Sequence, residues 1–276
     1  MQLLCGDRTL DLTQPCVMGV LNVTPDSFSD GGRYFDAGRA IEHAHRMVEQ
    51  GAAILDIGGE STRPGAPDVD TDDELRRVLP VIRALAVKVS VPVSVDTSKP
   101  DVMRAAVDEG ATLINDIRAL QSPGALVAAA GTRAAVCLMH MQGEPRTMQI
   151  EPRYGDVVRE VREFLKRRLE DCVRGGIRRE RIVIDPGFGF GKTLQHNLAL
   201  VNGLQQLTDL GVPVLAGLSR KAMLGTILGK PVDQRLYGSL ALATVAVLKG
   251  ARIIRAHDVA ETVDAVKVAA AVLKGG

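Results

Sequence analysis

The chain has 276 residues, 46% of them hydrophobic, and contains no tryptophan. Its 34 Lys and Arg residues almost balance its 33 Asp and Glu residues, which gives a formal net charge of +1. This balance argues against nucleic acid or an anionic membrane as the main partner.

Four cysteines stand at positions 5, 16, 137 and 172. Because none of them forms a C-x-x-C pair, neither a zinc site nor a redox pair is indicated, and free thiols in a reducing cytoplasm are expected. A signal peptide is not expected, because charged residues stand early in the chain at Asp7, Arg8 and Asp11. The longest apolar run, 240–248, is too short to span a bilayer. The sequence therefore predicts a cytoplasmic protein outside the membrane.

A strand-then-helix pattern recurs along the chain after residues 1–16, which are expected to form a short N-terminal hairpin. Short apolar runs predict eight strands, at 17–23, 52–59, 92–97, 112–117, 134–140, 181–187, 213–219 and 252–258. Amphipathic stretches between them, such as 36–51, 72–89 and 156–176, have the helical spacing of apolar residues. The pattern predicts one α/β domain over 1–276, a parallel (β/α)₈ TIM barrel at 17–276 whose N-terminal end the hairpin closes.

An open, doubly wound sheet is the alternative architecture. It is expected to carry a glycine-rich dinucleotide turn after an early strand, and "GVLNVTPDSFSDGG" is not such a turn. The segment "PGFGFGKT", 186–193, resembles a phosphate-binding P-loop only in part, because that motif needs four residues between its first Gly and the Gly-Lys pair. The barrel is therefore favoured.

Every predicted strand leads into polar or charged residues. Any one of them could simply end a strand or cap a helix. In a barrel of this kind, however, all of these ends meet at the rim that carries the active site, and eight such coincidences favour a ligand pocket there. The residues are Asn22, Asp56, Asp96, Asn115 with Asp116, His140, Asp185, Ser219 to Lys221, and Arg255 with His257.

Two features near the end of the chain indicate an anionic ligand. Lys221 begins a predicted helix, where a cation opposes the helix dipole, so an anionic or acceptor partner is expected beside it. Arg255 and His257 alternate with a period of two and therefore face the same side of the last strand. The loops after the seventh and eighth strands are the usual phosphate site of this fold, which makes phosphate the expected ligand.

Eight segments resemble the successive motifs of the bacterial dihydropteroate synthase family, in order and at normal spacing. They are "MGVLNVTPDSFSDGG", "DIGGESTRPGA", "SVDTSKP", "INDI", "CLMHMQG", "DPGFGFGKT", "GLSRK" and "RAHDV", within a resemblance that extends from about Leu3 to about Leu273. The family joins 6-hydroxymethyl-7,8-dihydropterin diphosphate to p-aminobenzoate, giving the folate precursor 7,8-dihydropteroate and pyrophosphate. The resemblance implies this reaction, by an SN1-like loss of pyrophosphate.

The resemblance also implies the roles of individual residues. The pterin would be bound by Asp96, Asn115, Asp185, Lys221, Ile117 and Gly217, with Met139 and Phe190 on its two faces. The diphosphate would be bound by Asn22, Arg63, Arg255 and His257, with Mg²⁺ as the cofactor and Asn22 as its ligand. p-Aminobenzoate would lie among Phe28, Thr62, Arg63, Pro64, Ser219 and Lys221, its carboxylate at the N–H groups near Ser219 and Arg220. The catalytic residues would be Asp96, Lys221, Arg63, Arg255 and His257.

The resemblance further implies a homodimer and inhibition by sulfonamides, which mimic p-aminobenzoate. Three alternatives stay open at the level of the sequence. One is a pterin-binding methyltransferase that moves a methyl group from methyltetrahydrofolate to a corrinoid protein. Another is a non-catalytic pterin-binding homologue. The last, resting on the fold alone, is a sugar-phosphate barrel enzyme.

Overall fold

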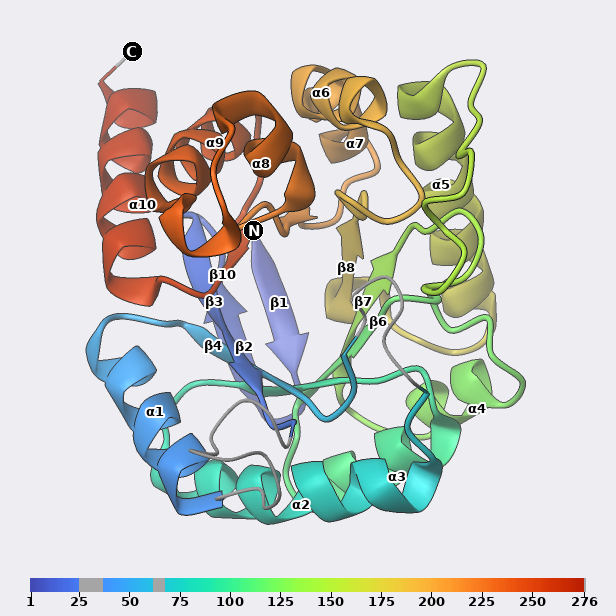
Figure 1. Cartoon of the computed structure of the whole chain (residues 1–276). Helices are drawn as coiled ribbons and strands as arrows, with labels where there is room; N and C mark the ends of the chain where they lie inside the picture. The colour runs from blue at the N-terminus through green and yellow to red at the C-terminus, as the bar shows by residue number, and fades with distance from the viewer. Residues whose placement is uncertain (25–36, 62–67, 276) are drawn as a thin grey trace.

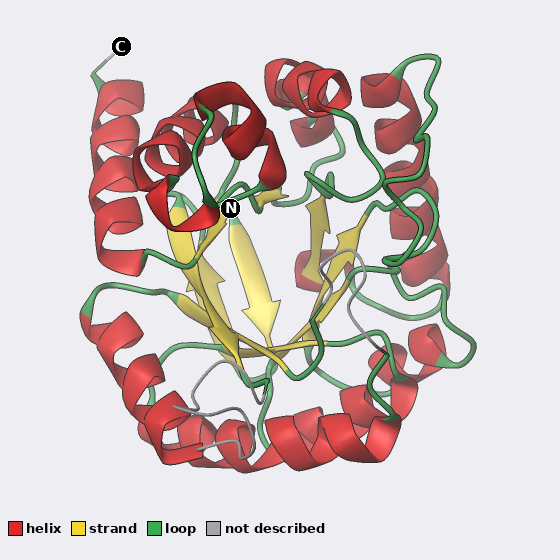
Figure 2. Ribbon diagram, in the orientation of Figure 1, coloured by secondary structure: helices red, strands yellow, loops and turns green. Residues whose placement is uncertain are grey.

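The computed structural model describes residues 1–24, 37–61 and 68–275. Within these residues, eight parallel strands form a ring surrounded by helices (Figure 1, Figure 2). The strands are β3 (Cys16–Asn22), β4 (Ile54–Gly58), β5 (Val93–Asp96), β6 (Leu113–Asp116), β7 (Ala135–Met139), β8 (Ile182–Asp185), β9 (Leu215–Ala216) and β10 (Ile253–Ala256). They pair in the order β8-β7-β6-β5-β4-β3-β10-β9, and a bridge between Ile184 and Val214 brings the two edges together. The predicted barrel is confirmed.

The seventh strand of the barrel is shorter than predicted. The apolar run at 213–219 indicates a strand of seven residues, whereas β9 has two. Pro213 precedes it and has no N–H to donate to a neighbouring strand, so regular pairing cannot begin there. Its carbonyl still accepts from the N–H of Ile184 at 3.0 Å, which helps to close the ring.

The helices of the described residues lie outside the ring (Figure 2). They are α1 (Ala37–Glu49), α2 (Thr71–Lys88), α3 (Pro100–Asp108), α4 (Ala125–Ala130), α5 (Val157–Arg174), α6 (Leu194–Gly203), α7 (Gln205–Thr208), α8 (Ala222–Leu228), α9 (Leu236–Leu248) and α10 (Val259–Lys274). Side-chain caps fix several starts: Asp70 accepts from the N–H of Asp73 at the start of α2, and Thr193 and His196 form a capping box at the start of α6. None of these helices combines the length and the apolar character that a membrane crossing requires.

Strand alternation divides the side chains between two environments. In β4, Leu55 and Ile57 pack in the large aliphatic core with the helix residues Val78 and Ile82. The alternate residue, Asp56, therefore points to the inside of the barrel, where its carboxylate is fully buried. This alternation places polar groups from several strands around the barrel axis.

The predicted N-terminal hairpin is confirmed and consists of β1 (Gln2–Cys5) paired with β2 (Arg8–Asp11). Leu3 and Cys5 are fully buried against the first residues of barrel strands, among them Ile54, Leu113 and Ile253. The hairpin therefore closes the N-terminal end of the barrel, and in Figure 1 it lies across the middle of the ring. The opposite end, where the strands finish, is left for a ligand.

Candidate active site

Three neighbouring strands bring two side-chain oxygens close to the backbone of Gly58. In the sheet register Asn22 of β3 pairs with Gly58 of β4, and Gly58 pairs with Asp96 of β5. A Cβ atom on Gly58 would lie 3.9 Å from Asn22 Oδ1 and 3.9 Å from Asp96 Oδ2, so both oxygens border the same space. An amide oxygen and a carboxylate oxygen suit Mg²⁺, which uses few protein ligands. The amide oxygen of Asn22 is therefore chemically suited to the expected metal, whereas Asp96 Oδ2 already accepts from Arg255.

A buried hydrogen-bond network joins four strands at this end of the barrel. The carboxylate of Asp56 accepts from Ser94 Oγ at 2.7 Å, Asn115 Nδ2 at 3.1 Å and Arg255 Nε at 2.6 Å. Arg255 Nη2 also donates to Asp96 Oδ2 at 2.8 Å. The carboxylate of Asp56 thus holds two of the predicted site residues, Asn115 and Arg255, in place. The third guanidinium nitrogen of Arg255, Nη1, takes part in neither of its ion pairs with Asp56 and Asp96.

The charges of this network perturb each other. Burial raises the pKa of Asp96 to about 7, with Arg255 opposing the shift and Asp56 adding to it. Burial alone would lower the pKa of Arg255, but the carboxylates of Asp56 and Asp96 outweigh it, so its pKa is raised and it stays cationic. The network therefore combines a permanent cation with a carboxylate that can change charge near neutral pH.

On the other side of the barrel, Asp185 and Lys221 approach each other. Asp185 Oδ1 accepts from the N–H of Gly187 at 2.7 Å, and a Cβ atom on Gly217 would lie 4.0 Å from Asp185 Oδ2. Burial raises the pKa of Asp185, against the effect of the Gly187 N–H and of nearby cations. Gly217 thus leaves room beside a carboxylate that the chain holds in an apolar setting.

The ammonium of Lys221 lies 4.3 Å from the centroid of the Phe190 ring, within cation–π range. Burial lowers the pKa of Lys221 to about 8, and the charge of Arg255 adds to this effect. Lys221 is the residue immediately before α8, as predicted. The ammonium of Lys221 therefore lies against an aromatic face and interacts electrostatically with the carboxylate of Asp185.

Ser219 and His257 meet at the ends of neighbouring strands. Ser219 Oγ lies 3.1 Å from His257 Nδ1, and the backbone N–H of His257 donates to Ser219 Oγ at 3.3 Å. Burial, followed by the charges of Arg255 and Arg220, lowers the pKa of His257 to about 4. The imidazole is neutral at physiological pH, and an arriving anion would favour its protonated form.

One expected ligand contact is already used inside the protein. The backbone N–H of Arg220, expected to face the carboxylate of p-aminobenzoate, donates instead to Ser239 Oγ at 2.9 Å. The Arg220 guanidinium forms an ion pair with Asp258, in which Nε donates to Oδ2 at 3.0 Å. The start of α9 thus supplies a hydroxyl that occupies the Arg220 N–H, and the contact of the carboxylate near Ser219 stays a prediction.

The glycine-rich segment after β8 makes close backbone contacts. Gly187, Gly189 and Gly191 all have positive φ angles, of 68°, 80° and 61°. A Cβ atom on Gly187 or Gly191 would collide with the backbone carbonyl of His140 or Gln142, respectively. Alternate glycines therefore let this segment lie directly against the end of β7.

Lys192 secures the same segment, and the sequence did not reveal this role. Its buried ammonium donates to the carbonyls of Gly187 and Phe190, both at 2.9 Å, and lies 3.0 Å from His140 Nδ1. Burial lowers the pKa of Lys192 to about 7. The only signal in the sequence is a Lys at the end of a run of alternating glycines, which belongs to the segment that fails to match a P-loop.

The other predicted residues fall into two groups. Met139 and Ile117 are buried and border a hollow of about 210 Å³ beside the ends of β6 and β7. Four further predicted residues lie outside the described residues: Phe28, Thr62, Arg63 and Pro64. The described residues of the predicted site therefore gather at the C-terminal end of the barrel.

A parallel barrel with carboxylate, amide and cationic groups at its open end defines a pterin-binding enzyme, and residues 18–257 match the family model described as pterin binding enzyme. The dihydropteroate synthase of Haemophilus influenzae is 52% identical over 268 residues, covering 97% of this chain and 98% of the relative. The chain belongs to the dihydropteroate synthase family.

Solved structures agree with this assignment. The Yersinia pestis dihydropteroate synthase in a sulfonamide drug complex is 51% identical, with a TM-score of 0.95, over 99% of this chain and 100% of the other. The Xanthomonas albilineans enzyme in complex with 7,8-dihydropteroate is 49% identical, with a TM-score of 0.90, over 99% of each chain. The predicted transferase activity is confirmed, in preference to a methyltransferase or a non-catalytic homologue.

Proposed function

We propose that this chain condenses 6-hydroxymethyl-7,8-dihydropterin diphosphate with p-aminobenzoate through the residues described above. The observation that carries the proposal is the meeting of two polar clusters at one end of the barrel: Asp56 with Asn115 and Arg255, and Asp185 with Lys221. Together they offer acceptors, donors and positive charge at one end of the barrel. These are the groups that a pterin carrying a diphosphate requires.

The pterin binds between the two clusters in this proposal. Its ring edge presents amine and ring N–H donors as well as acceptors, which Asp96, Asn115, Asp185 and Lys221 can satisfy in a desolvated setting. The space beside Gly217 admits the ring next to Asp185. Ile117 and Met139 supply apolar contacts, and Phe190, already in contact with the Lys221 ammonium, covers the opposite face.

The reaction then proceeds by charge separation. The bond between the methylene carbon and the diphosphate oxygen breaks, and its electron pair leaves with the diphosphate. The cation that remains on the methylene carbon is delocalised into the dihydropterin and stabilised by the ionised Asp96. The amine of p-aminobenzoate attacks this carbon and releases a proton to solvent, so no covalent enzyme intermediate forms.

Positive charge assists the departure of the diphosphate. Arg255, which stays cationic, and His257, which can take up a proton beside an anion, bind the leaving group together with Arg63. Mg²⁺ held by Asn22, when bound, supplies further positive charge to the diphosphate oxygens. The place of Asn22 at the C-terminal end of β3 supports this position for the metal.

p-Aminobenzoate binds, in this proposal, against Phe28, Thr62, Arg63, Pro64, Ser219 and Lys221. Sulfonamides occupy the same place, and the sulfonamide complex of the Yersinia pestis relative supports this. We also propose a cytoplasmic homodimer built from one barrel domain per chain. Exposed apolar side chains on and beside α8, α9 and α10, among them Leu228, Tyr237 and Val268, support pairing through that side.

The test is release of pyrophosphate from the pterin diphosphate, measured with and without p-aminobenzoate in the presence of Mg²⁺. We expect one 7,8-dihydropteroate for each pyrophosphate released, and competitive inhibition by a sulfonamide. Arg104→Met is a control that should release pyrophosphate as the unchanged chain does, because Arg104 is exposed on α3 and pairs there with Asp101. A chain that binds the pterin but forms no dihydropteroate would contradict the proposal.

A further inference from the structure

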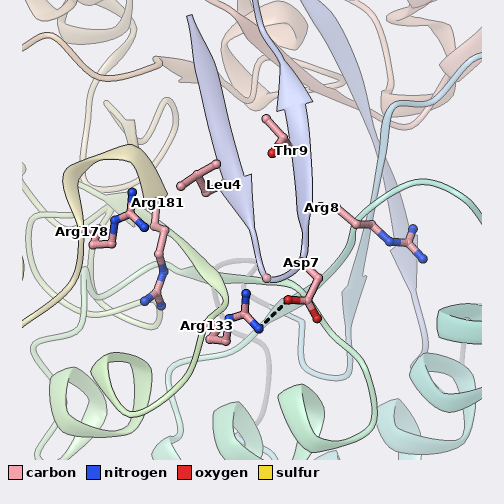
Figure 3. A pocket seen from close by; sticks show the side chains of 8 residues that line it. Leu4, Asp7, Arg8, Thr9, Arg133, Arg178 and Arg181 are labelled. Atoms are coloured by element: carbon pink, nitrogen blue, oxygen red, sulfur yellow. Dashed lines mark ion pairs between the residues drawn. The ribbon is translucent and has the colours of Figure 1, made fainter.

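A second hollow lies at the closed end of the barrel, away from the catalytic rim. Its volume is about 290 Å³, and the turn of the β1–β2 hairpin, Arg133 just before β7 and the turn ahead of β8 line it. Figure 3 shows this hollow from close by. Gly6 of the hairpin donates to the carbonyl of Arg133 at 3.0 Å, so the hollow follows the seam where the hairpin meets the barrel.

Arginines dominate the lining of this hollow. Arg133, Arg178 and Arg181 come from two separate segments and lie on the same side of the hairpin, whereas Arg8 points to the opposite side (Figure 3). Among the described residues that line the hollow, Asp7 is the one acidic side chain. The hollow therefore carries an excess of positive charge.

The guanidinium of Arg181 is held by a backbone carbonyl. Its side chain is 9% exposed, and Nε and Nη2 both donate to the carbonyl of Ala134, with Nε at 2.9 Å. A backbone carbonyl satisfies the hydrogen bonds but does not neutralise the charge. Burial lowers the pKa of Arg181, and the nearby charges of Arg178 and Arg133 lower it further, which agrees with like charges gathered at one place.

A purely structural role explains only part of this arrangement. Arg8 and Arg181 donate hydrogen bonds to backbone carbonyls at the N-terminal end of the barrel. Arg133 and Arg178 instead have largely exposed side chains, and their carboxylate partners, Asp7 and Glu180, are exposed as well. Exposed ion pairs contribute about 0–1 kcal/mol, so folding gives little reason for these two cations to converge beside Arg181.

We propose that this hollow is a binding site for a small phosphate-bearing anion, held by Arg133, Arg178 and Arg181. A guanidinium group matches the geometry of a phosphate and can donate two parallel hydrogen bonds to two of its oxygens. The volume exceeds that of a phosphate group alone and lies near the lower end of small-molecule sites, which span about 300–1,000 Å³. The occupant is therefore a phosphorylated small molecule, and its phosphate replaces Asp7 as the ion-pair partner of Arg133.

The test is a calorimetric titration of the whole chain with inorganic phosphate at constant ionic strength. The test variant is Arg133→Met/Arg178→Met, which leaves the buried Arg181 in place. Arg104→Met is the control, because Arg104 pairs with the exposed Asp101 much as Arg133 pairs with Asp7. We expect the double variant to bind phosphate at least about tenfold more weakly, the effect of losing one charge-assisted hydrogen bond. The control should bind phosphate as the unchanged chain does.

Pyrophosphate release from the pterin substrate should be equal in all three chains, because none of the three changed positions belongs to the catalytic rim. Failure of the proposed reaction would therefore appear in that assay and not in the titration. A crystal soaked in tungstate should place the anion between Arg133 and Arg181. Equal phosphate affinity in the double variant and the unchanged chain, or tungstate at the catalytic rim alone, would overturn the proposal.

Discussion

Asp56 provides a quantitative test of the polar network inside the barrel. Its fully buried carboxylate accepts hydrogen bonds from Ser94, Asn115 and Arg255. In Asp56→Asn the side chain keeps its shape and can keep all three bonds. The amide oxygen accepts from Asn115 and Arg255, while the amide nitrogen donates to the Ser94 hydroxyl, so the variant loses only the negative charge.

The two replacements at this position should differ in their effect on stability. Asp56→Asn should lower the free energy of unfolding by about 1–2 kcal/mol, because a charge-assisted bond to Arg255 becomes an ordinary one while Asp96 still balances the guanidinium. Asp56→Ala removes every acceptor and leaves the buried guanidinium with one carboxylate fewer. Breaking a buried ion pair in this way should lower the free energy of unfolding by about 3–5 kcal/mol.

The assay is urea unfolding followed by circular dichroism, with the slope compared between variants so that the midpoints report stability alone. Calorimetry with a pterin ligand provides the functional measurement, because Asp56 orients both Asn115 and Arg255. Ser94→Ala, which removes one donor and no charge, is the control. If both Asp56 variants lost less than about 1 kcal/mol, the carboxylate would not be the group that neutralises Arg255.

Four further outcomes are expected. Asp185→Asn should weaken pterin binding by about 1–3 kcal/mol in calorimetry, because one donor is left poorly paired; unchanged affinity would exclude the contact. His257→Ala should weaken binding of the pterin diphosphate more than binding of the free hydroxymethylpterin, and equal losses would show that His257 does not contact phosphate. With the pKa of Asp96 raised to about 7, kcat/KM should fall as the pH drops through 7 and the carboxylate takes up a proton, and Asp96→Asn should lack this acid limb. The pKa of Lys192 is lowered to about 7, so between pH 7 and the usual pKa of Lys the unfolded chain binds the proton more tightly than the folded chain. Lys192 should therefore make the free energy of unfolding rise with pH across this range. Lys192→Met should lack this rise in urea unfolding and should also raise the KM for the pterin substrate.

The sequence alone was enough to predict the barrel and the rim that carries the site. Strand and helix periodicities are local patterns, so the order of residues along the chain is sufficient to place the eight strands. In a parallel barrel every strand ends at the same rim, and chain order alone therefore indicated that Asn22, Asp96, Asn115, Asp185 and Arg255 converge. The chemistry assigned to them came from the resemblance of motifs, which identify a family through residue types and spacing.

Only the tertiary structure decided which of these groups pair. Arg255 donates to Asp56 across 199 positions of the chain, and no local pattern specifies such a partner. The same holds for the Arg220 N–H, which Ser239 occupies, and for Lys192, whose ammonium reaches back to the carbonyl of Gly187. Whether a hydrogen bond forms depends on differences of a few tenths of an ångström in the distance between donor and acceptor. The closure of the barrel sets these distances, because it brings together segments that are far apart in the sequence.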